Sequence, residues 1–171
     1  LHSISSGEYS HLGLRTQNRS LEEWRVFGER YFQKTKHALP SHYYDSITEF
    51  FNSEAFLADD LRSGSYVLCH NDLGVEHILI NNDEITGIID WGDVTLADPA
   101  CDLARIYRDL GPKALDKILL NYVCPDSVKE GIRERAMFFG KCLFFEDLHY
   151  GLTHKEYLKK SLRVIGEIFE G

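Results

Sequence analysis

The sequence changes its periodicity near the middle, and this change most limits the folds open to the chain. Before and after the middle, apolar residues recur at the three- and four-residue spacing of amphipathic helices. Between these parts stand three apolar runs of strand length, at residues 66–70, 77–81 and 85–90. The letters NND at the junction of the last two runs predict a hairpin turn. We therefore predict an α+β, mostly helical domain with a small β-hairpin region in its middle.

Helix start and stop signals divide the rest of the chain. Ser20 followed by Glu23 forms a capping box, and the helical pattern after it ends at Pro40. Pro112 suits the first turn of a later helix. Further helices are predicted for residues 43–61, 98–110 and 112–123, from residue 126 onward, and from about residue 154.

Composition excludes several classes of protein. The 171 residues are 43% hydrophobic and 27% charged, which fits one soluble domain with a continuous apolar core. The formal net charge of −8 argues against a nucleic-acid partner, since phosphate backbones attract basic surfaces, and it would suit a cationic substrate. No apolar run reaches the length of a membrane span, and the first residues lack the pattern of a signal peptide. We expect a cytoplasmic protein with no membrane partner.

The four cysteines give no sign of a metal or redox motif. They are widely spaced and form no C-x-x-C pair, so a zinc ribbon is not indicated. We expect buried, reduced thiols.

Polar residues converge at the ends of the predicted strands. His70 and Asp72 follow the first run, His77 opens the second, and Asp90 closes the third. A carboxylate on a loop between strands can accept a proton from a substrate hydroxyl. A second carboxylate, returned to the same edge by a hairpin, can bind a divalent cation. These two tasks together indicate phosphoryl transfer to an alcohol.

Two blocks of the sequence make this reading specific. The chain resembles the catalytic signature of the aminoglycoside phosphotransferase family at HNDLGVEHILI and at GIIDWGDVTLADPACDLA. The family pattern runs H-G-D-x-x-x-x-N-[IL]-[IL] and then [IV]-D-[WF]-[ED]-x-x-x-x-G-D-P-x-x-D-[LI]-[AS]. The resemblance implies a protein-kinase-like lobe whose β-hairpin region carries the catalytic loop. It implies that Asp72 orients or deprotonates the acceptor hydroxyl and that Asp90 binds Mg²⁺. His70 would hold the loop rather than take part in the chemistry.

Two positions depart from the family pattern. The family usually has asparagine where this chain has His77, although macrolide phosphotransferases resemble the chain in carrying histidine there. Imidazole is a poorer ligand for Mg²⁺ than an amide oxygen. His77 is predicted either to contact the metal, to donate a hydrogen bond to phosphate, or to fill space. Asp93 is shifted from the usual acidic position, which leaves a metal role for it in doubt.

The block after the hairpin resembles the structural part of the family motif. Asp98 is predicted to cap the next helix and to brace the catalytic loop. Asp102, in the first turn, is predicted to interact favourably with the helix dipole. On the acceptor side, the family pocket is lined by later helices. A cationic or polyhydroxyl acceptor could be held by residues clustered there, Glu146, Asp147, His149 and Tyr150, although such a cluster can also be merely solvated.

The resemblance also predicts how the domains are organised. A Gly-rich loop and a strand lysine, which grip nucleotide phosphates in kinases, do not occur before His70. The opening LHSISSG resembles the L-x-x-L-H-x-[IL] helix that follows the hinge after the family's nucleotide lobe. We expect residues 1–171 to be the C-terminal catalytic and substrate-binding lobe, with the nucleotide-binding lobe absent. The complete enzyme would use Mg²⁺ and ATP or GTP to phosphorylate a small-molecule hydroxyl, and this chain alone would be inactive and bind ATP weakly.

Two other functions stay open at this point. In a metal-dependent hydrolase, His70, Asp72, His77 and Asp90 would together bind zinc, manganese or iron and activate water. That reading leaves the D-P-A-C-D-L-A block unexplained. In a non-catalytic binding module, the kinase-like lobe would keep its fold without turnover.

Overall fold

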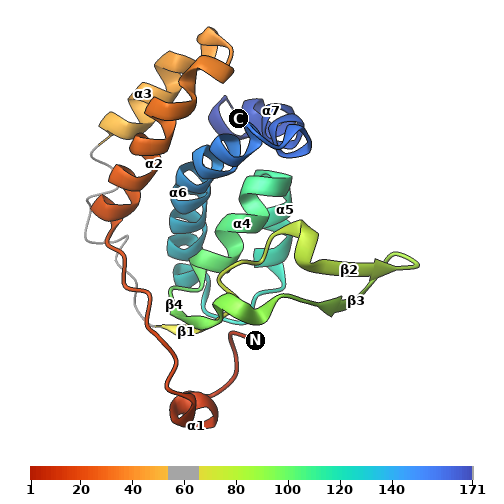
Figure 1. The fold of residues 1–171 in the computed structure, drawn as a ribbon. Coiled ribbons are helices and arrows are strands. Elements are labelled where there is room, and N and C mark those ends of the chain that lie inside the picture. The colour runs from red at the N-terminus through yellow and green to blue at the C-terminus, as the bar shows by residue number, and fades with distance from the viewer. Residues whose placement is uncertain (54–65, 171) are drawn as a thin grey trace.

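The computed structural model describes residues 1–53 and 66–170. Helices make up most of this part, and two small antiparallel sheets lie beside them (Figure 1). The helices are α1 (Ser6–Tyr9), α2 (Leu21–Thr35), α3 (Tyr44–Asn52), α4 (Ala100–Leu110), α5 (Pro112–Leu120), α6 (Asp126–Gly151) and α7 (Lys155–Phe169). The strands are β1 (Val67–Cys69), β2 (Ile78–Asn81), β3 (Glu84–Ile88) and β4 (Thr95–Ala97). The α+β, mostly helical prediction is confirmed.

The first long helix begins at the predicted cap. The Ser20 hydroxyl accepts the N–H of Glu23 at 3.2 Å, and the Glu23 carboxylate accepts the N–H of Ser20 at 2.7 Å. This reciprocal pair satisfies two of the N–H groups that a helix start leaves unpaired. The next predicted helix is present as α3, and its predicted residues 54–61 lie outside the described residues.

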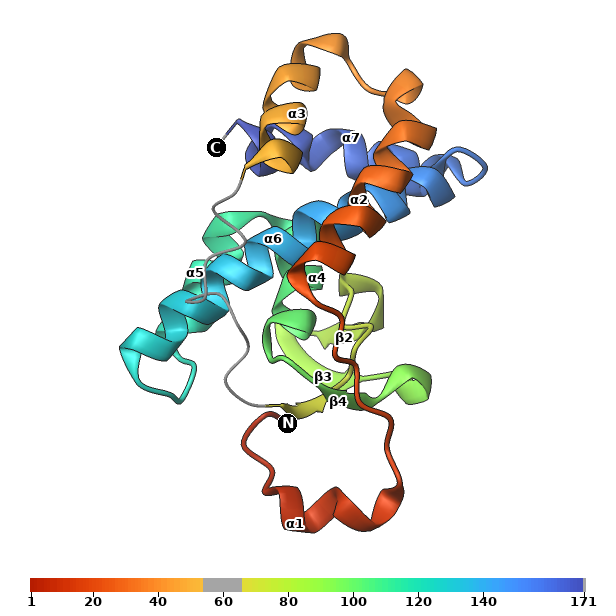
Figure 2. The same cartoon turned by 90° about the vertical axis from the view of Figure 1, so that its left-hand side faces the viewer.

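Helix α6 forms the centre of the helical body. Figures 1 and 2 show α2 along one side of α6, α4 along the other, and α7 crossing its C-terminal part. A Cβ atom on Gly140 of α6 would lie 2.5 Å from the ring of Tyr107 and 2.7 Å from the carbonyl oxygen of Ala104. Helices α4 and α6 therefore touch closely, which holds the middle of α4 firmly against the body. The aromatic core around this contact includes Trp24, Phe32, Phe50, Phe51, Phe138, Phe139, Phe144, Phe145 and Phe169.

Two antiparallel sheets of two strands each lie beside this body. Strands β2 and β3 form the predicted hairpin, with Ile78 opposite Ile88 and Asn81 opposite Glu84. Strand β1 pairs instead with β4, which the sequence analysis missed. Three residues are too few to show an alternating pattern, so β4 leaves no periodic signal. Its other edge is paired with residues 15–17 through backbone hydrogen bonds at Leu96.

The opening residues differ from the helix that LHSISSG suggested. Helix α1 begins only at Ser6, and residues 1–5 approach the body in a non-helical path. The His2 ring is hydrogen-bonded to Asp102 and Tyr122, which attaches this non-helical segment to the body.

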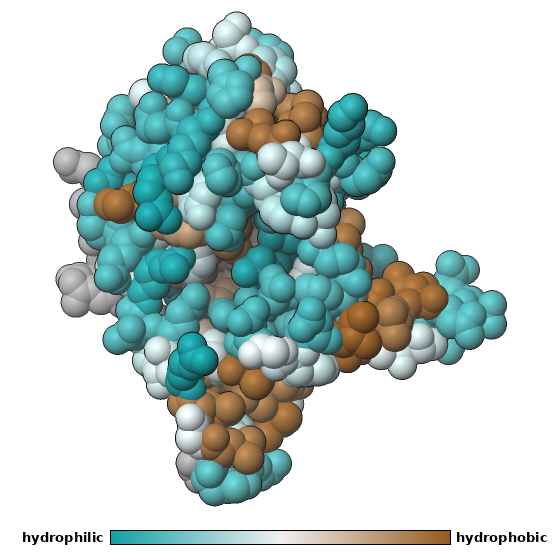
Figure 3. Space-filling model, in the orientation of Figure 1, coloured by the Kyte–Doolittle hydropathy of each residue, from teal (hydrophilic) through white to brown (hydrophobic). Residues whose placement is uncertain are grey.

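The β2–β3 hairpin projects from the body and carries apolar side chains on its surface. Leu79, Ile80 and Ile85 are 45%, 66% and 67% exposed, and Figure 3 shows apolar surface over this hairpin. Among the described helices, none is both long enough and apolar enough to cross a membrane. All four cysteines are free, and three of them are buried.

Candidate active site

The chain bends directly after β1, at residues 70–72. Asn71 has a left-handed backbone angle φ of 66°, which asparagine tolerates better than most residues. The backbone N–H groups of His70 and Asn71 donate to the two oxygens of Asp102, at 2.9 and 2.7 Å. Asp102 lies in the first turn of α4 and is 1% exposed. Because a carboxylate is a strong acceptor, these two bonds fix the loop to the start of α4.

The His70 imidazole joins this loop to the segment after β3. Its Nε2 lies 2.9 Å from the carbonyl oxygen of Ile89, which can only accept, so Nε2 carries the hydrogen. Its Nδ1 then accepts the N–H of Asp72 at 3.3 Å. The ring is fully buried and both nitrogens are engaged. His70 therefore offers no lone pair to a metal, and the hydrolase alternative loses one of its four ligands.

The Asp72 side chain is held on one side and open on the other. Its Oδ1 lies 2.8 Å from Nη1 of Arg105 on α4, and Nε of the same arginine donates to the carbonyl oxygen of Asn71 at 3.1 Å. Its Oδ2 is 3.7 Å from the His77 ring, which is beyond hydrogen-bonding distance. The side chain is 30% exposed, so Oδ2 can meet a ligand. Arg105 was not singled out from the sequence.

His77 stands between the two candidate carboxylates. Its Nδ1 lies 2.6 Å from the carbonyl oxygen of Asp72, so Nδ1 carries the hydrogen and Nε2 has a free lone pair. That Nε2 is 3.7 Å from Oδ2 of Asp90. The lone pair of His77 therefore faces the same space as the Asp90 carboxylate.

Asp90 follows β3 at a second left-handed position, with φ of 62° and ψ of 63°. Its side chain is 67% exposed. The N–H of the preceding Ile89 donates to the carbonyl oxygen of His77 at 3.0 Å, which ties the two segments together. The structure thus brings Asp72, His77 and Asp90 to one edge of the β2–β3 hairpin. Asp93 is exposed and lines a neighbouring cleft.

Asp98 connects α4 to α6. Its Oδ1 accepts the N–H of Ala100 at 2.8 Å, as a cap for α4. Its two oxygens also accept from the Arg135 guanidinium at 2.6 and 3.3 Å, and both side chains are 7% exposed. The side chain that accepts hydrogen bonds from the loop is Asp102 rather than Asp98. A sequence motif alone does not specify which of the two carboxylates makes this contact.

A cleft of about 230 Å³ opens beside the loop. Asn71 and Arg105 line one part of it, and Trp24, Arg19 and Glu146 line other parts. The guanidinium of Arg19 lies 4.4 Å from the centre of the Trp24 ring. Glu146 makes no hydrogen bond or ion pair with the described residues, so its carboxylate is available to the cleft. The lining is mostly polar, which suits a small polar molecule.

The residues predicted on the acceptor side do not act as one group. Of them, Glu146 lines the cleft. Asp147 pairs instead with Arg108, whose Nη1 and Nε lie 3.1 Å from its two oxygens. Burial raises the pKa of Asp147, although Arg108 opposes this. Tyr150 is 47% exposed near the end of α6, and His149 packs against an aromatic ring of α2.

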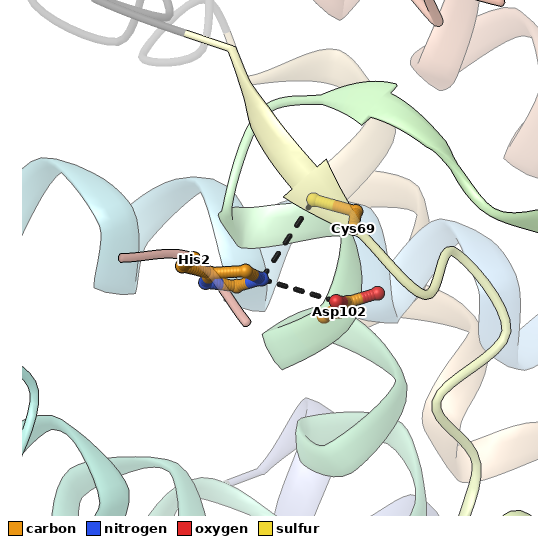
Figure 4. Close-up of side chains that lie close together, drawn as sticks. All are labelled: His2, Cys69 and Asp102. Carbon is orange, nitrogen blue, oxygen red and sulfur yellow. Dashed lines mark hydrogen bonds and ion pairs between the residues drawn. The ribbon is translucent and has the colours of Figure 1, made fainter. Parts of the chain in front are cut away.

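Among the described residues, one group of side chains could together hold a metal ion: His2, Cys69 and Asp102 (Figure 4). His2 Nε2 lies 3.0 Å from Asp102 and 3.7 Å from the Cys69 sulfur, and Nδ1 lies 2.6 Å from the hydroxyl of Tyr122. Burial, reinforced by the Asp102 carboxylate, raises the pKa of Cys69, so the thiol keeps its proton. Since the donors and acceptors already satisfy one another, we interpret this group as a hydrogen-bonded cluster that stabilises the loop rather than as a metal site.

Comparison with known proteins relates this geometry to one family. A model described as the phosphotransferase enzyme family matches residues 2–136. Viomycin phosphotransferase of Streptomyces vinaceus is 32% identical over 79 residues, which cover 44% of this chain and 28% of that protein.

Solved structures show the same fold. The GDP complex of wild-type aminoglycoside 2'-phosphotransferase-IIIa aligns with a TM-score of 0.69 at 21% identity, over 99% of this chain and 57% of that one. Macrolide 2'-phosphotransferase type I aligns with a TM-score of 0.56 at 20% identity, over 95% of this chain and 54% of that one. This chain therefore has the fold of one part of these kinase-like proteins and spans little more than half of their length.

Proposed function

Because the chain belongs to the phosphotransferase enzyme family, we propose that it carries the catalytic loop and cation site of an enzyme that phosphorylates a small-molecule hydroxyl. ATP or GTP would supply the terminal phosphoryl group. We further propose that residues 1–171 form the catalytic and acceptor-binding lobe. The observation that carries this proposal is the convergence of Asp72, His77 and Asp90 at one hairpin edge.

In this proposal Asp72 is the residue that accepts the proton of the acceptor hydroxyl. Arg105 holds Oδ1, and this leaves Oδ2 free to face the hydroxyl. A positioned carboxylate can orient an alcohol and take its proton as phosphoryl transfer proceeds. His70 holds the backbone of Asp72 through its Nδ1, and Asp102 holds the two residues before it.

The donors at the edge fit a divalent cation. The exposed carboxylate of Asp90 and the free Nε2 of His77 would hold it, with their atoms 3.7 Å apart. A carboxylate suits Mg²⁺, and the imidazole makes the pair more favourable for Mn²⁺ than an all-oxygen set would be. When bound, the cation would neutralise charge on the phosphates of the nucleotide.

The acceptor is proposed to bind in the cleft beside Asn71. Glu146 contributes a carboxylate that has no partner among the described residues, and Arg19, stacked on Trp24, contributes a guanidinium group. The lining carries charges of both signs, Glu146 and Asp93 beside Arg19 and Arg105, which favours a polar acceptor rich in hydroxyl groups.

Phosphate transfer by the full-length gene product tests the proposal. Radiolabelled ATP and GTP would be offered with a panel of amino- and hydroxyl-bearing acceptors. We expect Asp72→Ala to lower the rate by about 100-fold or more, because a positioned base is removed. Asp83→Ala is the control for the loss of a carboxylate, since Asp83 is an exposed residue of the hairpin turn.

The outcomes separate the functions under discussion. Equal transfer by wild type and Asp72→Ala would show that the role of Asp72 is wrong. The non-catalytic module would be favoured if the full-length product is folded and binds nucleotide, but neither phosphorylates any acceptor nor hydrolyses the nucleotide.

A further inference from the structure

A cluster of charged side chains lies behind the turn that carries His77. It draws on three helices and on the 3₁₀ turn Val75–His77. Its members are Arg108 and Asp109 of α4, Asp147 of α6, Lys160 of α7, and Glu76. Arg108 and Asp109 are 3% and 1% exposed. Charges buried this deeply are costly unless they are paired and hydrogen-bonded.

The carboxylate of Asp109 is fully engaged. Its Oδ1 lies 2.8 Å from Arg108 Nε and 2.9 Å from Lys160 Nζ. Its Oδ2 accepts from Arg108 Nη2 at 3.1 Å and from the backbone N–H of Val75 at 3.0 Å. Burial acts to raise the pKa of Asp109, but Arg108 and Lys160 outweigh it and hold the pKa below its ordinary value. The ionised carboxylate thus holds the first residue of the turn.

Lys160 holds the turn at a second point. Its Nζ also lies 3.2 Å from Oε2 of Glu76, the middle residue of the turn. His77 is the third residue, and its N–H donates to the carbonyl oxygen of Gly74 at 3.0 Å. The two residues before His77 are therefore both attached to the charged cluster.

The attachment of α7 does not depend on Lys160. Helix α7 also packs on the core through Val164, Ile165, Ile168 and Phe169, which are all buried. Removal of the ammonium group would therefore free Glu76 and take away one of the two cations that hold Asp109, while α7 stays docked.

We propose that Lys160 and Asp109 are positioning residues that fix the turn and thereby place the His77 ring between Asp72 and Asp90. This inference rests on the proposed function, in which His77 Nε2 faces the cation. Neither residue touches the reactants. Partners behind a ligand set its orientation, so their loss weakens a metal site without removing a ligand.

The test compares two adjacent lysines in this chain. Lys160→Met removes the charge beside Asp109, and Lys159→Met is the matched control, because Lys159 is 75% exposed and, among the described residues, pairs only with Glu156 of its own helix. Amide hydrogen exchange at Val75 is expected to rise about tenfold or more in Lys160→Met and to stay unchanged in Lys159→Met. Lys160→Arg should restore protection because it keeps the charge. Circular dichroism would show that each variant is folded.

Mn²⁺ affinity, measured by electron paramagnetic resonance, is the second readout. We expect about tenfold weaker binding in Lys160→Met and wild-type binding in Lys159→Met. Two results would overturn this inference alone. One is unchanged amide exchange at Val75 in Lys160→Met. The other is unchanged Mn²⁺ affinity in Lys160→Met when Asp90→Asn abolishes Mn²⁺ binding. Wild-type protein without Mn²⁺ binding, or Asp90→Asn that binds equally well, would overturn the proposed cation site and the inference with it.

Discussion

The underside of the loop at residues 70–72 and its open edge use carboxylates in opposite ways. On the underside, Asp98 and Asp102 are buried, and both oxygens of each accept hydrogen bonds. At the edge, Asp90 is 67% exposed and Asp72 keeps one oxygen clear of close donors. A carboxylate with all its bonds made can hold backbone in place, whereas one with free lone pairs can meet a cation or a hydroxyl. Substitutions on the underside should therefore cost stability, and substitutions at the edge should cost activity.

The largest expected loss of stability is in Asp98→Ala. This change leaves the Arg135 guanidinium buried without its partner and removes the cap of α4. We expect the free energy of unfolding to fall by about 3 to 5 kcal/mol. Urea denaturation followed by circular dichroism measures it.

The double variant Asp98→Leu with Arg135→Met sharpens this prediction. Replacing both charges with apolar groups removes the unpaired ion, so part of the lost stability should return. A double variant less stable than Asp98→Ala would contradict the ion-pair explanation.

A smaller loss is expected in Asp102→Asn. The amide keeps one acceptor oxygen for the N–H groups of His70 and Asn71, but it loses the charge that strengthens both bonds. We expect a loss of about 2 kcal/mol in the free energy of unfolding, measured as above. Wild-type stability would show that the loop does not depend on Asp102.

A third buried carboxylate, Asp109, should make the free energy of unfolding depend on pH. Burial would raise the pKa of Asp109, but Arg108 and Lys160 together bring it below the ordinary value of 3.8. A carboxyl whose folded pKa is lowered stabilises the fold above its unfolded pKa, and this contribution is lost as pH falls through the folded pKa. The stability difference between wild type and Asp109→Asn should therefore be full at neutral pH and should shrink below about pH 4. A difference that grows on acidification would contradict this sign.

Local sequence patterns predicted most of the fold. The helices and the β2–β3 hairpin follow from periodicities that lie within single segments, and the cap at Ser20 follows from a four-residue motif. Strand β4 was missed because its stability comes from β1 and residues 15–17 rather than from its own three residues.

The same limit applied to the candidate site. The carboxylates and His77 stood in recognisable motifs. Arg105 acts on a residue 34 positions away, and His2 on one 100 positions away, so neither contact has a local signature. Glu146 and Asp147 looked like parts of one cluster because they are adjacent in sequence, but they leave α6 in different directions, Glu146 towards the cleft and Asp147 towards Arg108.

The smallest stability effect is expected at the open edge. Asp90→Asn and Asp83→Asn should each change the free energy of unfolding by less than about 0.5 kcal/mol, since both side chains are exposed. Phosphate transfer by the full-length gene product should be lost only in Asp90→Asn. Equal phosphate transfer by the two variants would contradict a functional role for Asp90.

Electron spin echo modulation of Mn²⁺ bound to the chain tests the central claim most directly. If the cation lies between His77 and Asp90, the wild type should show modulation from a directly bound imidazole nitrogen. His77→Gln should remove the nitrogen signal, and Asp90→Asn should remove the bound Mn²⁺. Tightly bound Mn²⁺ without nitrogen coupling, or with coupling that His77→Gln leaves intact, would contradict the account.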